Sequence, residues 1–276
     1  MLAVAHRRIA TDACGCRQET RCRSSHGQSP DAMTLQRLDV LSRQPFYLSH
    51  PQKCPYLEGL AMKQIVTRLG DARDDDRLKL FSDLTAAGFR RSHDQVYRPA
   101  CDACAACVPV RVVVGDFSPT KTQRRLLKKF PPARWEDKIN EDEHYALFMR
   151  YQRARHAEGD MAAMTRHEFS QLAGSYGIHT RILCLRDDDK NLLAAMIVDV
   201  VDDGLSAVYS YYQPHDAGKG LGTALIVQLI RCAADAGKDF IYLGYWIKES
   251  KKMAYKSSFR PLQHLTGSGW QNLDKV

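Results

Sequence analysis

Residues 205–244 read LSAVYSYYQPHDAGKGLGTALIVQLIRCAADAGKDFIYLG, and this stretch decides the fold. Residues 205–212 have the aromatic and β-branched composition of a strand, and a glycine-rich turn follows at 218–222. A helix is expected from about Leu221 to Ala236, and residues 240–244 form the next strand. The glycines allow a close approach of the backbone, and the start of the helix presents free N–H groups to an anion.

Two more strands precede this unit, at 179–186 and 192–201. Their connections, 187–191 and 202–204, contain the Asp, Asn and Gly residues of hairpin turns. Three antiparallel strands followed by a turn, a helix and a strand are the core order of the N-acetyltransferase-like (GNAT) fold. In that fold the turn usually carries an Arg or Gln that helps to hold coenzyme A, and Ala217 stands there in this chain. A glycine-rich helix cap without a ligand is the simpler interpretation of the turn.

The whole chain is predicted to be a mixed α/β (α+β) protein in three parts. We expect a disordered extension over 1–32, an N-terminal cysteine-containing domain over 33–135 and a GNAT-like C-terminal domain over 136–276. Met33 is the expected natural start, and Cys14, Cys16 and Cys22 then lie outside the folded chain. Spacing, caps and turn residues predict further elements: helices over 60–69, from Asp74 to Gly88, after Ser118-Pro119, from Asn140 to Arg155 and after the capping box Thr165/Glu168, and a strand over 110–114.

The 276 residues carry a net charge of +8, which favours a polyanionic partner. No apolar run approaches the roughly 20 residues of a membrane-spanning helix, so no membrane partner is expected. Much of the positive charge lies in two segments, 121–129 and 248–260. Tyr245 and Trp246 stand beside the second segment, where rings could stack on unpaired bases while the lysines meet phosphates. The alternative is that both rings belong to the core and the lysines to a solvated loop.

Nine cysteines occur in the chain, and three of them form the series Cys101-x-x-Cys104-x-x-Cys107. Thiolates at this spacing can hold a zinc ion or an iron–sulfur cluster, and Cys54 is the best candidate for the fourth ligand. Reduced thiols in a tight turn are the alternative. Because no secretory signal is visible, we expect a reducing, cytoplasmic location.

The order of short motifs resembles the arginyl-tRNA–protein transferase family, and within it the bacterial aspartate/glutamate leucyltransferase branch. The resemblance runs from about Leu38 to the C-terminus and rests on these motifs: Cys54-Pro-Tyr-Leu-Glu-Gly59, Gly88-Phe-Arg-Arg-Ser92, Tyr97-Arg-Pro-Ala-Cys101, Ala106-Cys107-Val-Pro-Val-Arg111, Gln123-Arg-Arg125, Leu205-Ser-Ala-Val-Tyr209, Tyr212-Gln-Pro214, Leu243-Gly-Tyr-Trp-Ile247, Lys252-Met-Ala-Tyr-Lys256 and Phe259-x-Pro261. The chain departs from the family pattern at Leu57, Leu60 and Gln213.

The resemblance implies an enzyme of the N-end rule pathway of protein degradation. It would move leucine from leucyl-tRNA to the N-terminal amine of proteins that begin with Asp or Glu. The chemistry needs no cofactor beyond the aminoacyl-tRNA co-substrate, and DNA is not an expected partner. Transfer of arginine is the near alternative. A CoA-dependent N-acetyltransferase and a non-catalytic RNA-binding module are more distant ones.

The transfer chemistry and the family motifs together nominate catalytic and acceptor-binding residues. Asp199 is expected at a strand end facing the cleft, as amine orienter or weak base, with a buried hydrogen-bond acceptor as the alternative. Tyr209 is the second catalytic candidate. An acidic acceptor calls for guanidinium groups, which bind carboxylates through two hydrogen bonds. The candidates for this clamp are Arg90, Arg91, Arg98 and Arg111.

Further substrate contacts are expected from the strand ends and from the glycine-rich turn. These candidates are Tyr212, Gly220, Gly222, Tyr245 and Trp246. The tRNA is expected to lie across Lys121, Arg124, Arg125, Lys251, Lys252 and Lys256. By its position in the family motifs, the possible metal site comprises Cys54, Cys101, Cys104 and Cys107.

Overall fold

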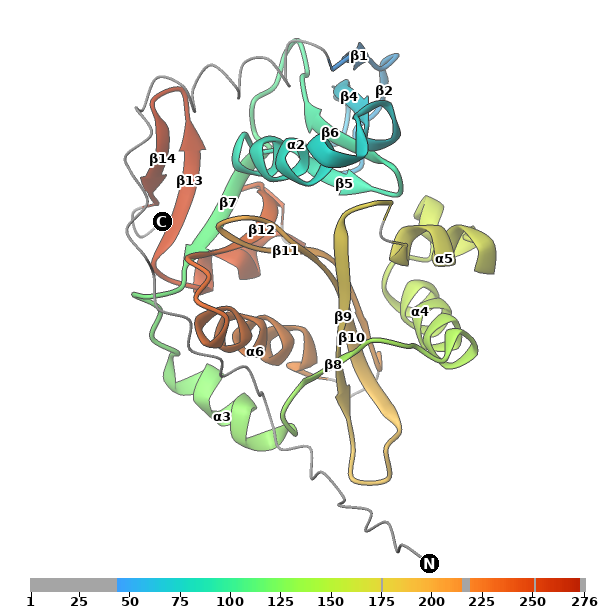
Figure 1. Cartoon of the computed structure of the whole chain (residues 1–276), viewed down its shortest axis with the longest axis vertical. Coiled ribbons are helices and arrows are strands. Elements are labelled where there is room, and N and C mark those ends of the chain that lie inside the picture. The colour runs from blue at the N-terminus through green and yellow to red at the C-terminus, as the bar shows by residue number, and fades with distance from the viewer. Residues whose placement is uncertain (1–43, 175, 215–218, 251, 274–276) are drawn as a thin grey trace, which may run out of the picture.

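The computed structural model describes residues 44–174, 176–214, 219–250 and 252–273. It confirms the mixed α/β class (Figure 1). The helices are α2 (Asp74–Ala86), α3 (Lys121–Lys129), α4 (Glu141–Arg155), α5 (Arg166–Ala173) and α6 (Leu221–Asp235), with 3-10 turns η1 (Leu69–Asp71), η2 (Asp160–Ala163) and η4 (Ala254–Ser258). The extension 1–32, its cysteines and Met33 lie outside the described residues, as do Ala217 and Lys251.

Three sheets contain the strands. A four-stranded sheet has the order β1 (Tyr47–Leu48), β4 (Gln64–Arg68), β6 (Gln95–Pro99), β5 (Arg90–Ser92), and β2 (Gln52–Lys53) pairs with β3 (Ala61–Met62). The large sheet has the order β14 (Gly269–Asn272), β13 (Leu262–Thr266), β7 (Val108–Val113), β12 (Phe240–Trp246), β11 (Gly204–Tyr212), β10 (Leu192–Val200), β9 (His179–Arg186), β8 (Arg134–Glu136).

The predicted acyltransferase-type core is present in the large sheet. β9, β10 and β11 are antiparallel neighbours, α6 follows, and β12 returns parallel to β11. The β11–β12 pairing covers only three residue pairs, from Gly204 opposite Phe240 to Ser206 opposite Tyr242. Both strands continue beyond this point, so they part toward their carboxyl ends.

β7 extends the sheet on the other side of β12. It lies in the segment 33–135 that the sequence assigned to the N-terminal domain, so the large sheet takes strands from both predicted domains. β13 and β14 complete the sheet beyond β7, and no sequence pattern predicted them.

The predicted helix over 60–69 is wrong. The segment forms β3, β4 and η1 instead. Its apolar residues keep helical spacing, but Ile65, Val66 and Thr67 are three β-branched residues in a row, which favour extended backbone. β4 also gains partners on both sides, from β1 and β6, and such long-range pairing is invisible to a local pattern.

The start of α3 also differs from the prediction. Thr120, and not Ser118, caps the helix, because its hydroxyl accepts from the N–H of Gln123 while the Gln123 side chain accepts from the N–H of Thr120. The predicted caps of α4 and α5 at Asn140 and Thr165 are confirmed.

The large sheet is covered on both faces. α6 packs on one face with a core that includes Leu183, Leu225 and Ile241, and α4 and α5 pack on the other around Phe148 and Phe169 (Figure 1). A third core joins α2 to the small sheet and reaches Tyr242 of β12. Within the described residues, none of the helices is long and apolar enough to cross a membrane.

Candidate active site

The gap between β11 and β12 is filled by an arginine from the small sheet. The Arg90 side chain extends from β5 and donates through Nη1 to Ser206 Oγ (2.9 Å) and to the Tyr242 carbonyl oxygen (3.4 Å). Its Nη2 donates to the carbonyl oxygen of Ala207. The guanidinium therefore supplies donors to carbonyls on the two strands at the point where the strands separate.

Gly244 makes room for this arginine. The register of β12 against β7 shifts between Tyr242 and Gly244, and Gly244 has φ +77°. A Cβ at this position would lie 2.8 Å from Arg90 Nε. Glycine is thus required in the motif around Gly244 both by the backbone conformation and by the neighbouring guanidinium.

Lys256 approaches the same region from η4. It is only 7% exposed, and its Nζ donates to the carbonyl oxygen of Tyr245 (2.6 Å). Burial and the nearby positive charge of Arg90 lower the pKa of Lys256 to about 7. Lys256 is therefore not part of the exposed basic surface on which we predicted the tRNA to lie.

A group of tyrosines lies beside the gap. Tyr209 and Tyr212 come from β11, and the ring of Tyr151 of α4 packs at a tilt against that of Tyr212, with the ring centroids 4.7 Å apart. Gly222, at the start of α6, leaves room for the Tyr212 ring, since a Cβ there would lie 3.0 Å from it. Tyr255, which is 48% exposed, is close enough to Arg90, Tyr209 and Tyr212 to interact with them electrostatically.

Gln152 of α4 is a site residue that the sequence analysis missed. It is fully buried, and its Nε2 donates to Tyr209 Oη (2.7 Å). Its Oε1 is buried without a hydrogen-bond partner among the described residues. Burial raises the pKa of Tyr209, so the phenol keeps its proton and can donate it. A buried glutamine in the middle of a helix carries no sequence signal of this role.

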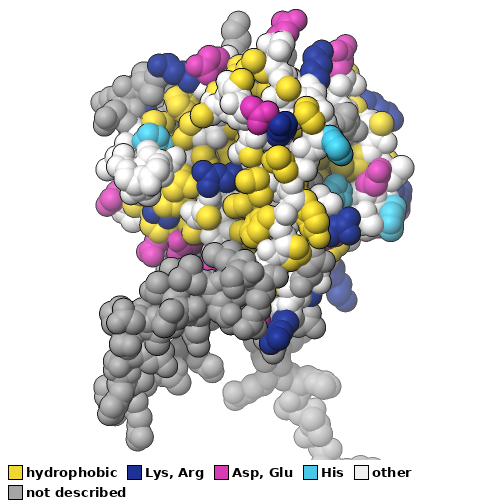
Figure 2. Space-filling view, turned by 90° about the horizontal axis from the view of Figure 1, so that it is seen from above, with side chains coloured by type: hydrophobic (Ala, Val, Ile, Leu, Met, Phe, Trp, Pro, Cys, Tyr) yellow, Lys and Arg dark blue, Asp and Glu magenta, His cyan; other side chains and the backbone are white. Residues whose placement is uncertain are grey.

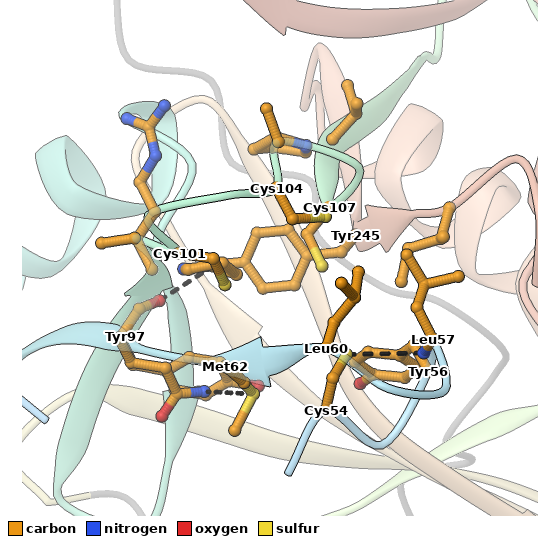
Figure 3. Close-up of a pocket in the computed structure, with 18 of the residues that line it drawn as sticks. Cys54, Tyr56, Leu57, Leu60, Met62, Tyr97, Cys101, Cys104, Cys107 and Tyr245 are labelled. Atoms are coloured by element: carbon orange, nitrogen blue, oxygen red, sulfur yellow. Dashed lines mark hydrogen bonds between the residues drawn. The ribbon is translucent and has the colours of Figure 1, made fainter. Parts of the chain in front are cut away.

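A cavity of about 470 Å³ lies on the other side of Tyr97 and Tyr245, between residues 54–64, 97–109 and the β13–β14 turn. Figure 3 shows its apolar lining, which includes Tyr56, Leu57, Leu60 and Met62. Tyr245 lines the cavity and follows Gly244, which packs against Arg90, so the cavity and the strand gap are neighbours. No aspartate or glutamate is among the described residues that line the cavity.

All four predicted metal-binding cysteines line this cavity (Figure 3). Cys54 Sγ accepts from the N–H of Leu57 (3.4 Å), and Cys101 Sγ donates to the Lys63 carbonyl oxygen (3.7 Å). Burial and the neighbouring cysteines raise the pKa of Cys107 to about 11.

The spacing of the sulfurs does not fit a metal. Tetrahedral zinc with bonds of ~2.3 Å holds its sulfurs roughly 3.8 Å apart. Among the described residues, no three of these four sulfur atoms lie within 4.8 Å of one another. The one described group that does meet this limit is Glu136, His144 and Cys184, but both oxygens of Glu136 already accept from Arg186.

Asp199 does not face a cleft, and that part of the prediction is wrong. Its carboxylate is fully buried and accepts from Arg91 Nε (2.7 Å) and Nη2 (3.0 Å) and from Thr180 Oγ1 (2.7 Å). This placement favours the alternative interpretation of Asp199 as a buried hydrogen-bond acceptor. Because Nε and Nη2 of Arg91 both donate to Asp199, they are not available to bind a substrate carboxylate.

The other predicted clamp residues divide in two. Arg111 stacks on Phe240 at 3.4 Å and donates to Gln263 Oε1 (2.9 Å), so it braces β7 against its neighbours. Arg98 lines the mouth of the cavity and donates to the Ala87 carbonyl oxygen (3.0 Å). Arg90 and Arg98 are therefore the clamp candidates that lie at the site.

Tyr245 and Trp246 have different surroundings. Tyr245 lines the cavity, and its Oη lies 3.0 Å from the carbonyl oxygens of Gly88 and Tyr97. Trp246 is a buried member of the core against α6, which leaves no ring face for an adenine. The burial of Trp246 therefore favours the alternative that its ring belongs to the core.

The basic residues of α3 lie on the surface. Lys121, Arg124 and Arg125 are exposed, as is Lys252 near η4. α3 packs against α6 where Leu126 contacts Gly220, the left-handed N-cap of α6. Lys129 Nζ donates to the Lys219 carbonyl oxygen (3.4 Å), so the basic helix and the start of α6 are adjacent.

Figure 2 shows the molecule from above, over the small sheet and α2. Hydrophobic side chains gather across the middle of this face, with Lys and Arg side chains among them. The exposed apolar residues include Phe46, Tyr47 and Leu48, in and beside the edge strand β1.

Two family models match the chain. The model of the arginine-tRNA-protein transferase N terminus matches residues 52–125, and that of the C terminus matches residues 143–266. Both predicted domains are thus represented, and the matches leave residues 126–142 between them.

Several relatives are similar over most of their length. An aspartate/glutamate leucyltransferase of Parvibaculum lavamentivorans is 46% identical over 228 residues, which cover 82% of this chain and 93% of the relative. One of Gluconacetobacter diazotrophicus is 42% identical over 234 residues, covering 84% of this chain and 89% of the relative. Among solved structures, L-PGS from Bacillus licheniformis aligns at 13% identity with a TM-score of 0.43 over 81% of this chain and 78% of that chain.

Proposed function

Because this chain belongs to the arginine-tRNA-protein transferase family, we propose that it transfers leucine from leucyl-tRNA to proteins that begin with Asp or Glu. Relatives named aspartate/glutamate leucyltransferase, which match this chain over most of their length, support this activity. The co-substrate, charged tRNA, is made in the cytoplasm, and we place the reaction there. The product would carry an N-terminal leucine that marks it for degradation.

The apolar cavity is the observation that carries leucine as the transferred residue. Its lining is dominated by apolar and aromatic side chains such as Leu57, Leu60 and Met62. A buried arginine side chain would need a carboxylate partner, and the described lining provides none. A leucine side chain gains free energy in such a cavity simply by leaving water.

The reaction is aminolysis of an ester. The α-amine nitrogen attacks the ester carbonyl carbon, the bond from that carbon to the ribose oxygen breaks, and the amine proton is passed to the released ribose hydroxyl. An α-amine has a pKa of about 7.7–8.0, so a useful fraction is already neutral near pH 7. Much of the rate can therefore come from holding the amine and the ester together.

Tyr209 and Gln152 are suited to position the reacting groups. Tyr209 Oη accepts from Gln152, so its own proton can be donated to the oxyanion that forms during attack. The buried Gln152 fixes the position of the Tyr209 hydroxyl through this hydrogen bond. Asp199, which we predicted from the sequence as amine orienter, lies away from these atoms in its own ion pair with Arg91.

The tRNA is proposed to lie along α3. Lys121, Arg124 and Arg125 form an exposed basic surface beside the N-terminus of α6. Phosphates bind both to lysine and arginine side chains and to the free N–H groups at the start of a helix. Lys252 extends the charged surface near η4.

A transfer assay tests the proposal. Purified protein is offered tRNA charged with leucine, arginine, methionine or phenylalanine, with peptides that start in Asp, Glu, Asn or Lys. We expect labelling of the Asp and Glu peptides from leucyl-tRNA only. Labelling from arginyl-tRNA at an equal rate would reject leucine, and no labelling of acidic peptides from any tRNA would reject the transferase activity.

To test the role of the cavity, Ala100→Leu reduces its volume and Ala103→Leu is the matched control. Ala100 lines the cavity, whereas Ala103 is exposed on the same loop and does not. We expect the first substitution to raise KM for leucyl-tRNA and the second to leave it unchanged. Equal KM values for both variants would show that the cavity does not bind the leucyl group.

A further inference from the structure

We propose that Lys256 and Arg90 together form the receptor for the side-chain carboxylate of the acidic acceptor residue. This inference rests on the proposed function and adds to it the groups that select Asp and Glu. The two cations come from distant parts of the chain, η4 and β5, and both donate to backbone carbonyls of β12, Lys256 to Tyr245 and Arg90 to Tyr242.

The charge balance of the protein interior singles out this pair. Two Lys or Arg residues are buried in the described part of the chain, Arg91 and Lys256. Arg91 has a carboxylate partner, Asp199, held through two hydrogen bonds. Lys256 has none among the described residues, and the neighbouring charge that acts most strongly on it is another cation, Arg90. An ammonium group that is buried without a counter-ion is unfavourable unless an anion arrives.

Arg90 is likewise without a carboxylate in the described structure. Its named partners are a hydroxyl and two carbonyl oxygens, all neutral. By contrast, the half-buried Arg186 pairs with both Glu136 and Glu143. The fold thus neutralises Arg91 and Arg186 with carboxylates, whereas Lys256 and Arg90 have none among the described residues.

Both groups retain donors for an incoming carboxylate. The ammonium group of Lys256 has three N–H bonds, and the carbonyl oxygen of Tyr245 accepts one of them. The guanidinium of Arg90 has five, of which three serve the contacts described above. A carboxylate can accept from both groups at once, which fixes its position as well as balancing its charge.

The position of the pair suits the acceptor rather than the tRNA. Arg90 packs against Gly244, the neighbour of the cavity residue Tyr245, and donates to Ala207 of β11, two residues before Tyr209. A carboxylate bound here would place the α-amine of the same residue near the gap, where the leucyl ester must also arrive. Asparagine and glutamine have the right shapes but no charge, so they would leave the two cations unbalanced.

The test measures the activity of the Lys256→Met variant on peptides that begin with Asp or Glu and on matching peptides that begin with Asn or Gln. Methionine has a similar length and no charge. The measured quantity is the ratio of kcat/KM for an Asp peptide to that for the matching Asn peptide, with Glu against Gln as a second pair. Because both peptides are assayed on the same preparation, a partly unfolded fraction cancels from the ratio. The matched control is Lys248→Met, an exposed lysine of the same segment.

We expect Lys256→Met to lower the Asp-to-Asn ratio roughly ten- to a hundredfold, the range for loss of one hydrogen bond to a charged group. Lys248→Met should keep the wild-type ratio. An unchanged ratio in Lys256→Met would overturn the proposal. An equal loss of activity toward both peptides would also overturn it, because it would indicate that Lys256 only holds Tyr245 in place.

A binding measurement covers the case in which Lys256→Met does not fold. The wild-type protein should be stabilised against thermal unfolding by an Asp peptide and not by the Asn peptide at the same concentration. Equal stabilisation by both would also overturn the receptor. Failure of the proposed function is distinguishable, because the wild type would then bind acidic peptides yet label none of them from any charged tRNA.

Discussion

Neighbouring residues on one short strand have opposite roles. Arg90 and Arg91 are adjacent in β5, and successive side chains of a strand point to opposite faces. Arg90 therefore reaches the gap between β11 and β12, whereas Arg91 forms the buried ion pair with Asp199. The sequence marked both as candidates for one clamp, because a motif does not tell which face each side chain takes.

Asp199→Asn should destabilise the fold more than it affects the chemistry. Removing one partner of a buried ion pair leaves the other charge uncompensated, at a cost of about 3–5 kcal/mol. Denaturant unfolding measures this loss, and the exposed Asp202→Asn is the control, expected within about 0.5 kcal/mol of wild type. A variant that is fully stable but has lost kcat would restore Asp199 to the catalytic residues.

Part of the site could be recognised residue by residue, and part could not. The motifs pointed to Arg90, Tyr209, Tyr212 and Tyr245, all of which lie at the gap or the cavity. Gln152 was missed, since a polar residue in an amphipathic helix looks the same whether it faces solvent or a buried phenol. The burial of Lys256 was missed for a similar reason, because a lysine among other lysines reads as surface.

At the scale of elements, an arginine joins three parts of the fold. Arg186 of β9 binds Glu136 of β8 and Glu143 of α4. Hydrogen bonds and the charge of Arg186 lower the pKa of Glu143, and the same contacts outweigh burial to lower the pKa of Glu136. A carboxylate with a lowered pKa in the folded state stabilises the fold above its ordinary pKa, and this contribution is lost as the pH falls.

Arg186→Met should therefore be most harmful near neutral pH. The difference in unfolding free energy between wild type and variant should shrink as the pH falls from about 5 to about 3, where both glutamates take up protons. Denaturant titrations across this range measure it. A difference that stays constant with pH would mean that Arg186 acts through packing rather than charge.

The basic helix α3 predicts a salt effect on tRNA binding. Each lysine or arginine that meets a phosphate releases a counterion, so Arg125→Ala should weaken binding and reduce the salt slope by about one. The exposed Lys138→Ala, away from α3, should leave the slope as it is. Wild-type slopes in both variants would place the tRNA elsewhere.

Local pattern predicted the elements of the C-terminal half far better than those of the N-terminal half. β9, β10, β11 and α6 follow in sequence with short turns, so local patterns and neighbouring contacts agree. β4 depends on β1 and β6, which lie far from it in sequence. β13 pairs with β7, which lies more than a hundred residues earlier in the chain, and β14 pairs with β13.

The whole molecule acts as one unit at the site. β7, from the N-terminal segment, is the neighbour of β12, and Arg90 enters the gap on the other side of that strand. The predicted boundary at residues 135 and 136 therefore cuts through the large sheet. The positive charge is also unevenly distributed. α3 carries exposed lysines and arginines, whereas Lys256 and Arg90 lie inside without a carboxylate partner among the described residues.

A C-terminal fragment over 136–276 should lack activity and aggregate. It would expose the β12 edge, which β7 covers in the full chain, and would lack Arg90. Co-expression with residues 33–135 should recover some soluble, active complex, measured by co-purification and by the transfer assay. An active fragment on its own would show that the N-terminal part is dispensable for catalysis.

The gap between β11 and β12 also determines how far synthesis of the chain must proceed before activity can begin. Its arginine is made at residue 90, its strands end at Tyr212 and Trp246, and its buried lysine comes at residue 256. A ribosome must therefore have passed residue 256 before the centre can form. An enzyme whose product directs other proteins to destruction would thus stay inert throughout its own synthesis.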